Sequence, residues 1–333
     1  MKKILLLIII LLLSQNTTAE KFKFATYNIF FLDQAISQER KVRLQKIIDH
    51  LDADIIAFQE IDSEAALKNI LPDDYTIAMI DDPEEILEVA LAVRPPFKII
   101  HKRYVFPDET YENAFPRNRD LLQVEVKGPN QNYFFLVHHT KSRRGGRVKT
   151  DKRREAASIL IVDYIREKLD GELVILLGDF NDNPDDRSVN ILEMGDSTAV
   201  GGPDELEDRF LYNTTEKLLE EDYCSYGIYK YDEQMADSVY RPVINGARSE
   251  NNKWRNREFN YYKDVQIKAI LFDQILVSMN LKNNIVSSGV YSGTEAVQGT
   301  ETKIKFIEGD IHYTRRGSLP SDHVPVWVEI SEK

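Results

Sequence analysis

Apolar runs of strand length recur along the chain, with turn-forming residues between them. The runs cover residues 22–27, 54–58, 89–93, 121–126, 133–137, 173–177, 270–277 and 324–330. Runs of this length with turn chemistry on both sides predict buried strands. Several of them end directly in a side chain that can bind a cation or a phosphate.

Two other segments, 37–51 and 151–169, have the spacing of an amphipathic helix. In each, apolar residues recur at i, i+3, i+4 and i+7, which places them on one face. They are Leu44, Ile47, Ile48 and Leu51 in the first segment and Ala157, Leu160, Ile161 and Tyr164 in the second. Many strands with a few interspersed helices predict an α/β sandwich, with sheets at the core and helices outside.

The composition fits a large core, since 42% of the 333 residues are hydrophobic and 29% are charged. No internal repeat or linker divides residues 20–333, so we expect a single domain there. Segment 195–262 is the least regular and is rich in tyrosine. Its tyrosines could stack on a ligand, and partly buried loop tyrosines are the plainer alternative.

The N-terminal segment 1–19 has the pattern of a secretory signal peptide. Lys2 and Lys3 precede the apolar run 4–13, and a polar stretch ending in Ala19 follows. A membrane anchor is the alternative, but a spanning helix needs about 20 apolar residues. We therefore expect the mature chain to be exported, secreted or periplasmic, without stable membrane association, and monomeric.

Charge and cysteine content limit the possible partners. Removal of Lys2 and Lys3 takes the formal net charge from −12 to −14, so the overall field repels polyanions. A phosphate substrate then requires a local basic patch or a metal ion. Cys224 is the only cysteine, which excludes an intramolecular disulfide.

Polar side chains gather at the ends of the predicted strands. Each has a structural explanation by itself: Asn28 could cap a turn, Glu60 could open a helix, and His139 could be a satisfied buried histidine. Asp273 lies inside an apolar run, where an unpaired carboxylate is very costly and a partner is needed. Four further polar side chains lie near the ends of predicted strands: Asp179, Asn181, Asp322 and His323. So many side chains that can bind a cation or a phosphate, all near strand ends or inside a strand, predict a shared site.

Six short stretches contain these residues. They are TYNIF (26–30), FQE (58–60), VHHTKS (137–142), GDFND (178–182), FDQILVS (272–278) and SDHVPV (321–326). In this order the chain resembles the endonuclease/exonuclease/phosphatase superfamily, which includes DNase I and the abasic-site endonucleases. The resemblance implies a four-layer α/β sandwich, two packed mixed β-sheets flanked by helices, and hydrolysis of phosphodiesters.

The resemblance also implies a metal site and a water site. Glu60 would be the principal ligand of Mg²⁺ or Mn²⁺, helped by Asn28 and Asp322. Asp179 and Asn181 would position the attacking water and the scissile phosphate. Oxygen ligands with one or two carboxylates suit Mg²⁺, which keeps several of its waters.

The remaining roles fall to two histidines and an arginine. His323, oriented by Asp273, would be the general base or the electrostatic partner of the phosphate. His139 would donate to a phosphoryl oxygen, and Arg119 would clamp the phosphate. A carboxylate partner for His139 is expected near residues 89–93, with Glu88 as the candidate.

Segment 141–154, directly after the histidine stretch, reverses the acidic background with eight Lys/Arg and one Asp. Its position favours contact with phosphates, and pairing with acids of the protein is the alternative. The predicted substrate-binding residues are Lys141, Arg143, Arg144, Arg147 and Lys149.

These features predict a metal-dependent endonuclease, with DNA as the first expected substrate. A phospholipid or sphingomyelin phosphodiesterase is the enzymatic alternative, and it should show an exposed hydrophobic hairpin for the bilayer. The loops of this sequence are polar instead. A non-catalytic phosphate-binding protein is a further alternative, although such proteins usually lose catalytic side chains and none is missing here.

Overall fold

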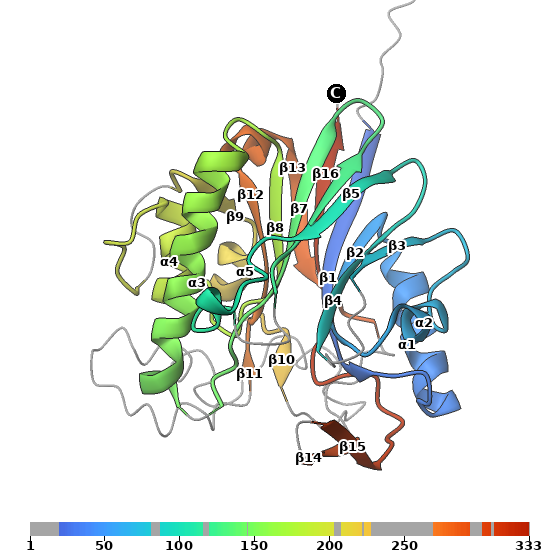
Figure 1. The fold of residues 1–333 in the computed structure, drawn as a ribbon. Coiled ribbons are helices and arrows are strands. Elements are labelled where there is room, and N and C mark those ends of the chain that lie inside the picture. Colours follow the sequence, from blue (N-terminus) through green and yellow to red (C-terminus); the bar gives the residue numbers. More distant parts are fainter. Residues whose placement is uncertain are drawn as a thin grey trace, which may run out of the picture.

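The computed structural model describes residues 20–80, 87–115, 120–144, 146–202, 208–221, 223–227, 269–293, 302–307 and 310–332. Two six-stranded mixed sheets lie face to face, with helices on both outer faces (Figure 1). The first sheet has the order β13 (Ile285–Val290), β16 (Val326–Glu332), β1 (Glu20–Leu32), β2 (Ile55–Ile61), β4 (Glu88–Val93), β3 (Thr76–Met79). The second has the order β5 (Lys98–Tyr104), β6 (Leu122–Lys127), β7 (Asn132–His139), β8 (Val174–Asp179), β12 (Asp273–Ser278), β9 (Leu211–Asn213). The predicted four-layer sandwich is confirmed.

The helices cover the two sheets from opposite sides. The first sheet is flanked by α1 (Gln38–Leu51) and α2 (Glu64–Lys68), and the second by α3 (Arg147–Lys168) and α4 (Arg187–Met194) (Figure 1). α5 (Glu216–Glu220) and the 3-10 helices Glu109–Tyr111 and Met279–Asn284 are short. Helix α1 begins where its pattern predicts, because the Ser37 hydroxyl accepts from the backbone N–H of Arg40 at 3.2 Å.

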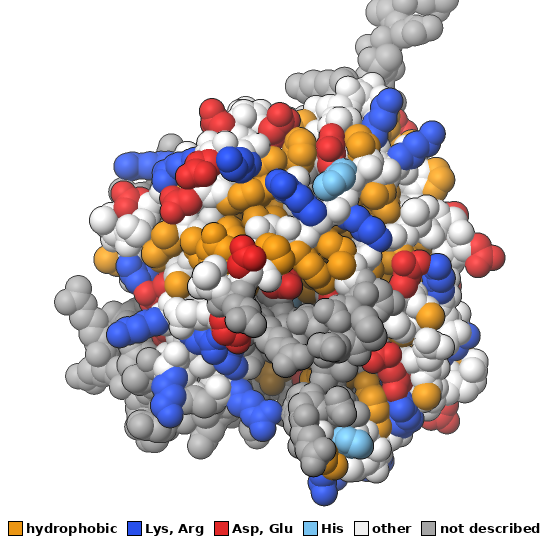
Figure 2. All heavy atoms as spheres, viewed as in Figure 1, with side chains coloured by type: hydrophobic (Ala, Val, Ile, Leu, Met, Phe, Trp, Pro, Cys, Tyr) orange, Lys and Arg blue, Asp and Glu red, His pale blue; other side chains and the backbone are white. Residues whose placement is uncertain are grey.

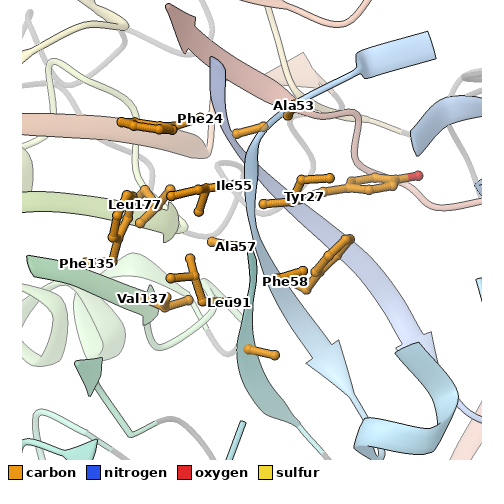
Figure 3. Packing of buried hydrophobic residues seen from close by; sticks show 14 of the residues in the cluster. Phe24, Tyr27, Ala53, Ile55, Ala57, Phe58, Leu91, Phe135, Val137 and Leu177 are labelled. Atoms are coloured by element: carbon orange, nitrogen blue, oxygen red, sulfur yellow. The ribbon is translucent and has the colours of Figure 1, made fainter. Parts of the chain in front are cut away.

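The main core fills the space between the sheets. Phe24 from the first sheet meets Phe135 from the second edge to face, with ring centroids 5.3 Å apart. Figure 3 shows Ile55 on the same side as Phe24, facing Leu177, whereas Phe58 points to the opposite side of its sheet. This alternation follows from the two-residue period of a strand and explains why nearly every residue of β2 is buried.

Strand direction brings the polar strand ends together. β1 runs parallel to β2, and β7 runs parallel to β8, so the strands of each pair finish together, and the hydrogen bond from Asn28 to Asp179 places both pairs' ends at the same end of the sandwich. β12 and β16 run antiparallel to their neighbours and therefore begin at that end. Two small two-stranded sheets also lie there (Figure 1). They pair β10 (Tyr226–Gly227) with β11 (Ala269–Ile270) and β14 (Lys303–Ile307) with β15 (Asp310–Arg315).

Sequence periodicity did not identify the shorter or more polar elements. These are β3, β5, β9, β13, the β14–β15 hairpin, α2, α4 and α5. In β5 most side chains are exposed, which leaves no apolar run to detect. The predicted signal peptide, 1–19, lies outside the described residues. Within the described ranges, no helix is long and apolar enough to cross a membrane.

Candidate active site

Asp179, at the end of β8, is the centre of the polar cluster. Its register partners are His139 on β7 and Asp273 on β12, so three adjacent strands bring their polar residues to one level. The Nε2 of His139 lies 3.6 Å from Oδ2 of Asp179 and 3.7 Å from Oε1 of Glu60. The side chain of His139 is buried, so this contact is shielded from bulk water.

Asn28 links the two sheets at this end. Its amide nitrogen donates to Oε1 of Glu60 at 3.2 Å and to Oδ2 of Asp179 at 3.0 Å. Glu60 has a φ of 64°, and the β2 pairing shifts register there. Such a bulge re-aims a side chain, and left-handed backbone at a non-glycine residue is characteristic of functional sites.

His323 is held by Asp273 and faces Asp179. Its Nδ1 lies 2.7 Å from Oδ2 of Asp273, and its Nε2 lies 3.9 Å from Oδ2 of Asp179. Burial alone would lower the pKa of His323, but the carboxylates of Asp273 and Asp179 outweigh burial and raise the pKa to about 10. Burial raises the pKa of Asp179 to about 6, although the nearby His323 opposes that shift. The imidazole is therefore oriented and favours its charged form.

The loop after β8 supplies Asn181, which has a φ of 50°. Its backbone N–H donates to Oδ1 of Asp179 at 2.8 Å, and its side-chain nitrogen donates to the carbonyl of Thr140 at 3.3 Å. The loop thus closes on the carboxylate that precedes it. Both oxygens of Asp179 are held, one by Asn181 and the other by Asn28.

Gly178 permits the close approach of β8 to β7. A Cβ at this position would lie 1.8 Å from the carbonyl oxygen of His138, so no side chain fits there. The alternation along β7 then separates the two histidines. The ring of His138 packs between Phe115 and Phe180, at centroid distances of 5.8 Å and 5.5 Å, whereas His139 faces the carboxylates.

A model of the Endonuclease/Exonuclease/phosphatase family matches residues 33–332. The chain belongs to this family. Its members are phosphodiesterase and phosphatase hydrolases that depend on a divalent metal. No curated protein matches the sequence.

Solved structures of the family share the fold at low sequence identity. Humanised D. rerio TDP2 is 16% identical, with a TM-score of 0.54 over 94% of this chain and 99% of that one. A family protein from Bacteroides thetaiotaomicron is 17% identical, with a TM-score of 0.55 over 95% and 99%. The human Nocturnin catalytic domain is 16% identical, with a TM-score of 0.51 over 93% and 93%. At these identities the likeness shows the fold alone.

The carboxylates present fit a divalent cation of the kind the family uses. Oδ1 of Asp322 is buried and has no hydrogen-bond partner among the described residues. Burial raises the pKa of Asp322 to about 6, and the charge of nearby Glu60 adds to this shift. A cation bound between two buried carboxylates offsets the electrostatic repulsion between them. The oxygen of Asn28 accepts from the N–H of Phe30 at 3.0 Å, so its role as a ligand stays a prediction.

A second group, Asp179, Asp273 and His323, offers three ligand atoms within 4.8 Å of one another. Two of its members are already bonded to each other, and an imidazole in its charged form offers no lone pair to a metal. The geometry of this group therefore fits proton handling better than metal binding.

The structure corrects the prediction that Arg143 and Arg147 bind phosphates. Both side chains are buried, at 5% and 4% exposure. Arg143 donates to Asp182 at 3.0 Å and also to Asp186, and Arg147 donates to Asp186 at 2.6 Å. A guanidinium enclosed by carboxylates is not available to a substrate, so the alternative of pairing with the protein's own acids holds for these two.

The ion pairs extend to a third arginine and anchor the GDFND loop. Arg154 donates to Oδ2 of Asp182 at 2.6 Å and to Asp151. Arg143 also donates to the carbonyl of Asn181 at 2.8 Å. We call Arg143, Arg147, Arg154, Asp151, Asp182 and Asp186 the arginine cluster. It fixes the loop of Asn181 to the first turns of α3.

The remaining predicted site residues differ in exposure, and one of them lies outside the described residues. Arg144 and Lys149 are exposed, and Lys141 is half-buried, so contact with a substrate stays a prediction for all three. Arg119 lies outside the described residues. Glu88 is buried and accepts a hydrogen bond from the hydroxyl of Tyr104. Its role as the partner of His139 also stays a prediction.

Arg40 is a buried residue that sequence reasoning missed. Its guanidinium donates to the carbonyls of Ile29 and Phe30, each at 2.6 Å, and to that of Pro320 at 3.1 Å. It therefore joins the turn after Asn28 to the loop before Asp322. The signal was a charged residue on the apolar face of a predicted helix.

Tyr226 belongs to the irregular segment and enters the site. Its ring lies 4.9 Å from that of His323 and stacks on the ring of Phe272 at a centroid distance of 5.0 Å, with an interplanar angle of 26°. Arg143 in turn lies 5.0 Å above the Phe272 ring. This stack connects the arginine cluster to His323.

Proposed function

We propose that this protein is a metal-dependent phosphodiesterase that hydrolyses nucleic acid, an exported endonuclease with DNA as its first substrate. One observation carries the proposal. Three side chains from separate segments, Asn28, His139 and His323, lie 3.0, 3.6 and 3.9 Å from the same carboxylate oxygen of Asp179. Donors from separate segments that converge on one point support phosphoryl chemistry, because that chemistry needs preorganised donors where negative charge develops.

Each group has a role that follows from its position. Attack on a phosphodiester places extra negative charge on the phosphoryl oxygens. His139 and His323 donate toward that charge, and Asp273 fixes which nitrogen of His323 does so. Asp179 and Asn181 position the water and the phosphate at the same place.

A divalent cation, Mg²⁺ or Mn²⁺, supplies further positive charge when bound. Glu60 and Asp322 would hold it, with Asn28 beside them. Both metals accept carboxylate and amide oxygens, and the site offers these rather than thiolates or several neutral imidazoles.

Two observations support a polynucleotide substrate. Arg144 and Lys149 are exposed and follow His139, the last residue of β7, closely in the chain. A family structure that matches this fold is D. rerio TDP2 complexed with a single-strand DNA product. Phospholipid or sphingomyelin hydrolysis is the competing activity, and direct comparison decides between them.

The test is a comparison of five substrates with Mg²⁺: double-stranded DNA, single-stranded DNA, RNA, sphingomyelin and an inositol polyphosphate. We expect nucleic acid to be cleaved fastest. A His323→Ala preparation, purified identically, controls for contaminating nucleases and should be nearly inactive. Faster turnover of sphingomyelin than of any nucleic acid would overturn the proposed substrate class.

A further inference from the structure

The β14–β15 hairpin is attached beside the catalytic centre. The Tyr313 hydroxyl donates to the carbonyl of Phe31 at 3.0 Å, and Arg316 pairs with Asp33 at 2.6 Å. Phe31 and Asp33 follow Asn28 closely in the chain, and Arg316 shortly precedes Asp322. The hairpin is therefore tied to both loops that carry the metal-site residues (Figure 1).

The two faces of the hairpin differ in character. Ile304 lies opposite Tyr313, and the Tyr313 hydroxyl reaches the body of the protein. On the other face Lys305 lies opposite His312, and Lys303 lies opposite Arg315 beyond a register shift between Lys303 and Ile304. All four of these side chains are exposed: Lys303, Lys305, His312 and Arg315. In Figure 2, blue and pale-blue side chains lie at the lower edge, where Figure 1 places this hairpin.

This face concentrates positive charge in a chain whose formal net charge is −12. Lys303 and Lys305 share the face because alternate residues of a strand do so. Arg315 lies across from Lys303, so an anionic ligand lying along the face would meet three cationic side chains.

We infer that the β14–β15 hairpin is a basic arm that binds backbone phosphates of a polynucleotide next to the scissile bond. The inference rests on the proposed function and names the surface that holds the substrate. The hairpin would supply the phosphate contacts that the buried Arg143 and Arg147 are not available to make. A polynucleotide offers a row of phosphates, whereas a single inositol phosphate does not.

The hairpin fits a polynucleotide better than a bilayer. Ile307 is exposed at the end of β14, and it is the one large apolar side chain known to be exposed among the described residues of the hairpin. Membrane binding scales with the apolar area that is buried, so one such residue is a weak anchor. Binding to vesicles is therefore an alternative outcome of the test.

The test measures binding without cleavage. A fluorescein-labelled DNA duplex is titrated in EDTA at several salt concentrations, with fluorescence anisotropy as the readout. We expect the triple variant Lys303→Ala, Lys305→Ala, Arg315→Ala to flatten the slope of log Kd against log salt by about two to three units, if each residue neutralises one phosphate. Hydrolysis of bis(p-nitrophenyl) phosphate, which is too small to reach the hairpin, should be unchanged.

A charge reversal separates binding from folding. Lys303→Glu places opposite charges across the hairpin, so the melting temperature of this variant should not fall below that of the wild type. The slope of log Kd against log salt should still flatten by about one unit or more. Lys127→Glu is the matched control, because exposed Lys127 lies opposite Lys98 at the far end of its sheet. It should leave DNA binding unchanged.

The outcomes distinguish the two proposals. An unchanged Kd and salt slope in the triple variant, with DNA cleavage intact in the wild type, overturns the hairpin inference alone. Wild-type protein that hydrolyses the small diester but neither binds nor cleaves any polynucleotide overturns the proposed substrate as well. Hairpin-dependent binding to phosphatidylcholine–phosphatidylserine vesicles, with DNA binding unaffected, overturns the inference in favour of a membrane.

Discussion

The Nδ1 of His323 lies 2.7 Å from Oδ2 of Asp273, and both side chains are buried. Asp273 is the partner that a carboxylate inside an apolar run requires, and His323 gains a fixed orientation from it. The two residues form one hydrogen-bonded pair that connects the start of β12 to the loop before β16.

Removal of either member should therefore have a similar effect. General acid–base groups contribute typically about 10²- to 10⁴-fold, so His323→Ala and Asp273→Asn should each lower kcat by about that much. The double variant should be little worse than either single variant. Rates on a small phosphodiester, with thermal unfolding as a check on folding, measure this. Multiplicative losses in the double variant would mean that the two residues act independently.

Arg40 should behave as a positioning residue. Arg40→Lys keeps a positive charge but cannot donate to the carbonyls of Ile29, Phe30 and Pro320 together. We expect kcat to fall about tenfold or more with little change in KM, because the loops of the metal site lose their alignment. Arg43→Lys, on the same helix, is the matched control and should retain wild-type kinetics. Equal loss in both variants would remove Arg40 from this role.

The arginine cluster should give an acid-sensitive contribution to stability. Burial acts to raise the pKa of Asp182, but the charges of Arg154 and Arg143 outweigh burial and hold the pKa below its usual range. A carboxyl whose pKa is lowered by folding stabilises the fold above its unfolded pKa of about 3.9, and this stability is lost as the pH falls through the folded value. Asp182→Asn should therefore reduce the free energy of unfolding by about 3 to 5 kcal/mol at neutral pH.

As the pH falls below about 4, the difference in unfolding free energy between wild type and Asp182→Asn should narrow progressively, because the carboxyl of the unfolded chain takes up a proton first and the folded carboxyl does so only at its lower pKa. Urea unfolding at several pH values measures the difference. Exposed Asp163→Asn, on α3, is the control and should stay within about 0.5 kcal/mol of wild type throughout. A difference that is the same at low and neutral pH would contradict the assigned role of Asp182.

The sequence predicted the main strands and the polar residues that meet at their ends, because both depend on local order along the chain. Apolar runs identified β1, β2, β7 and β8, and the residue after each run marked the site. The sequence did not show which charged side chains pair with each other in the folded chain. Arg143 and Arg147 resemble phosphate ligands in a sequence, and only the folded chain shows Asp186 between them. The β14–β15 hairpin was missed because polar and apolar residues alternate along β14, which leaves no apolar run to detect.

The N-terminal segment gives a prediction that is independent of the site. If 1–19 is a signal peptide, the protein isolated from the medium or periplasm of its native host should begin at or near Glu20. Intact-mass spectrometry measures this directly. A membrane-bound form that retains Met1 would show that the segment is an anchor.

The central claim is that Asn28, Glu60, Asp179, Asp322 and the two histidines form one metal-dependent phosphodiesterase site. The most direct measurement is DNA hydrolysis after exhaustive chelation with EDTA and again after Mg²⁺ or Mn²⁺ is restored. We predict that chelation abolishes cleavage, that added metal restores it, and that Glu60→Gln needs a higher metal concentration for half-maximal rate. Full activity of the wild-type protein after exhaustive chelation would contradict the claim.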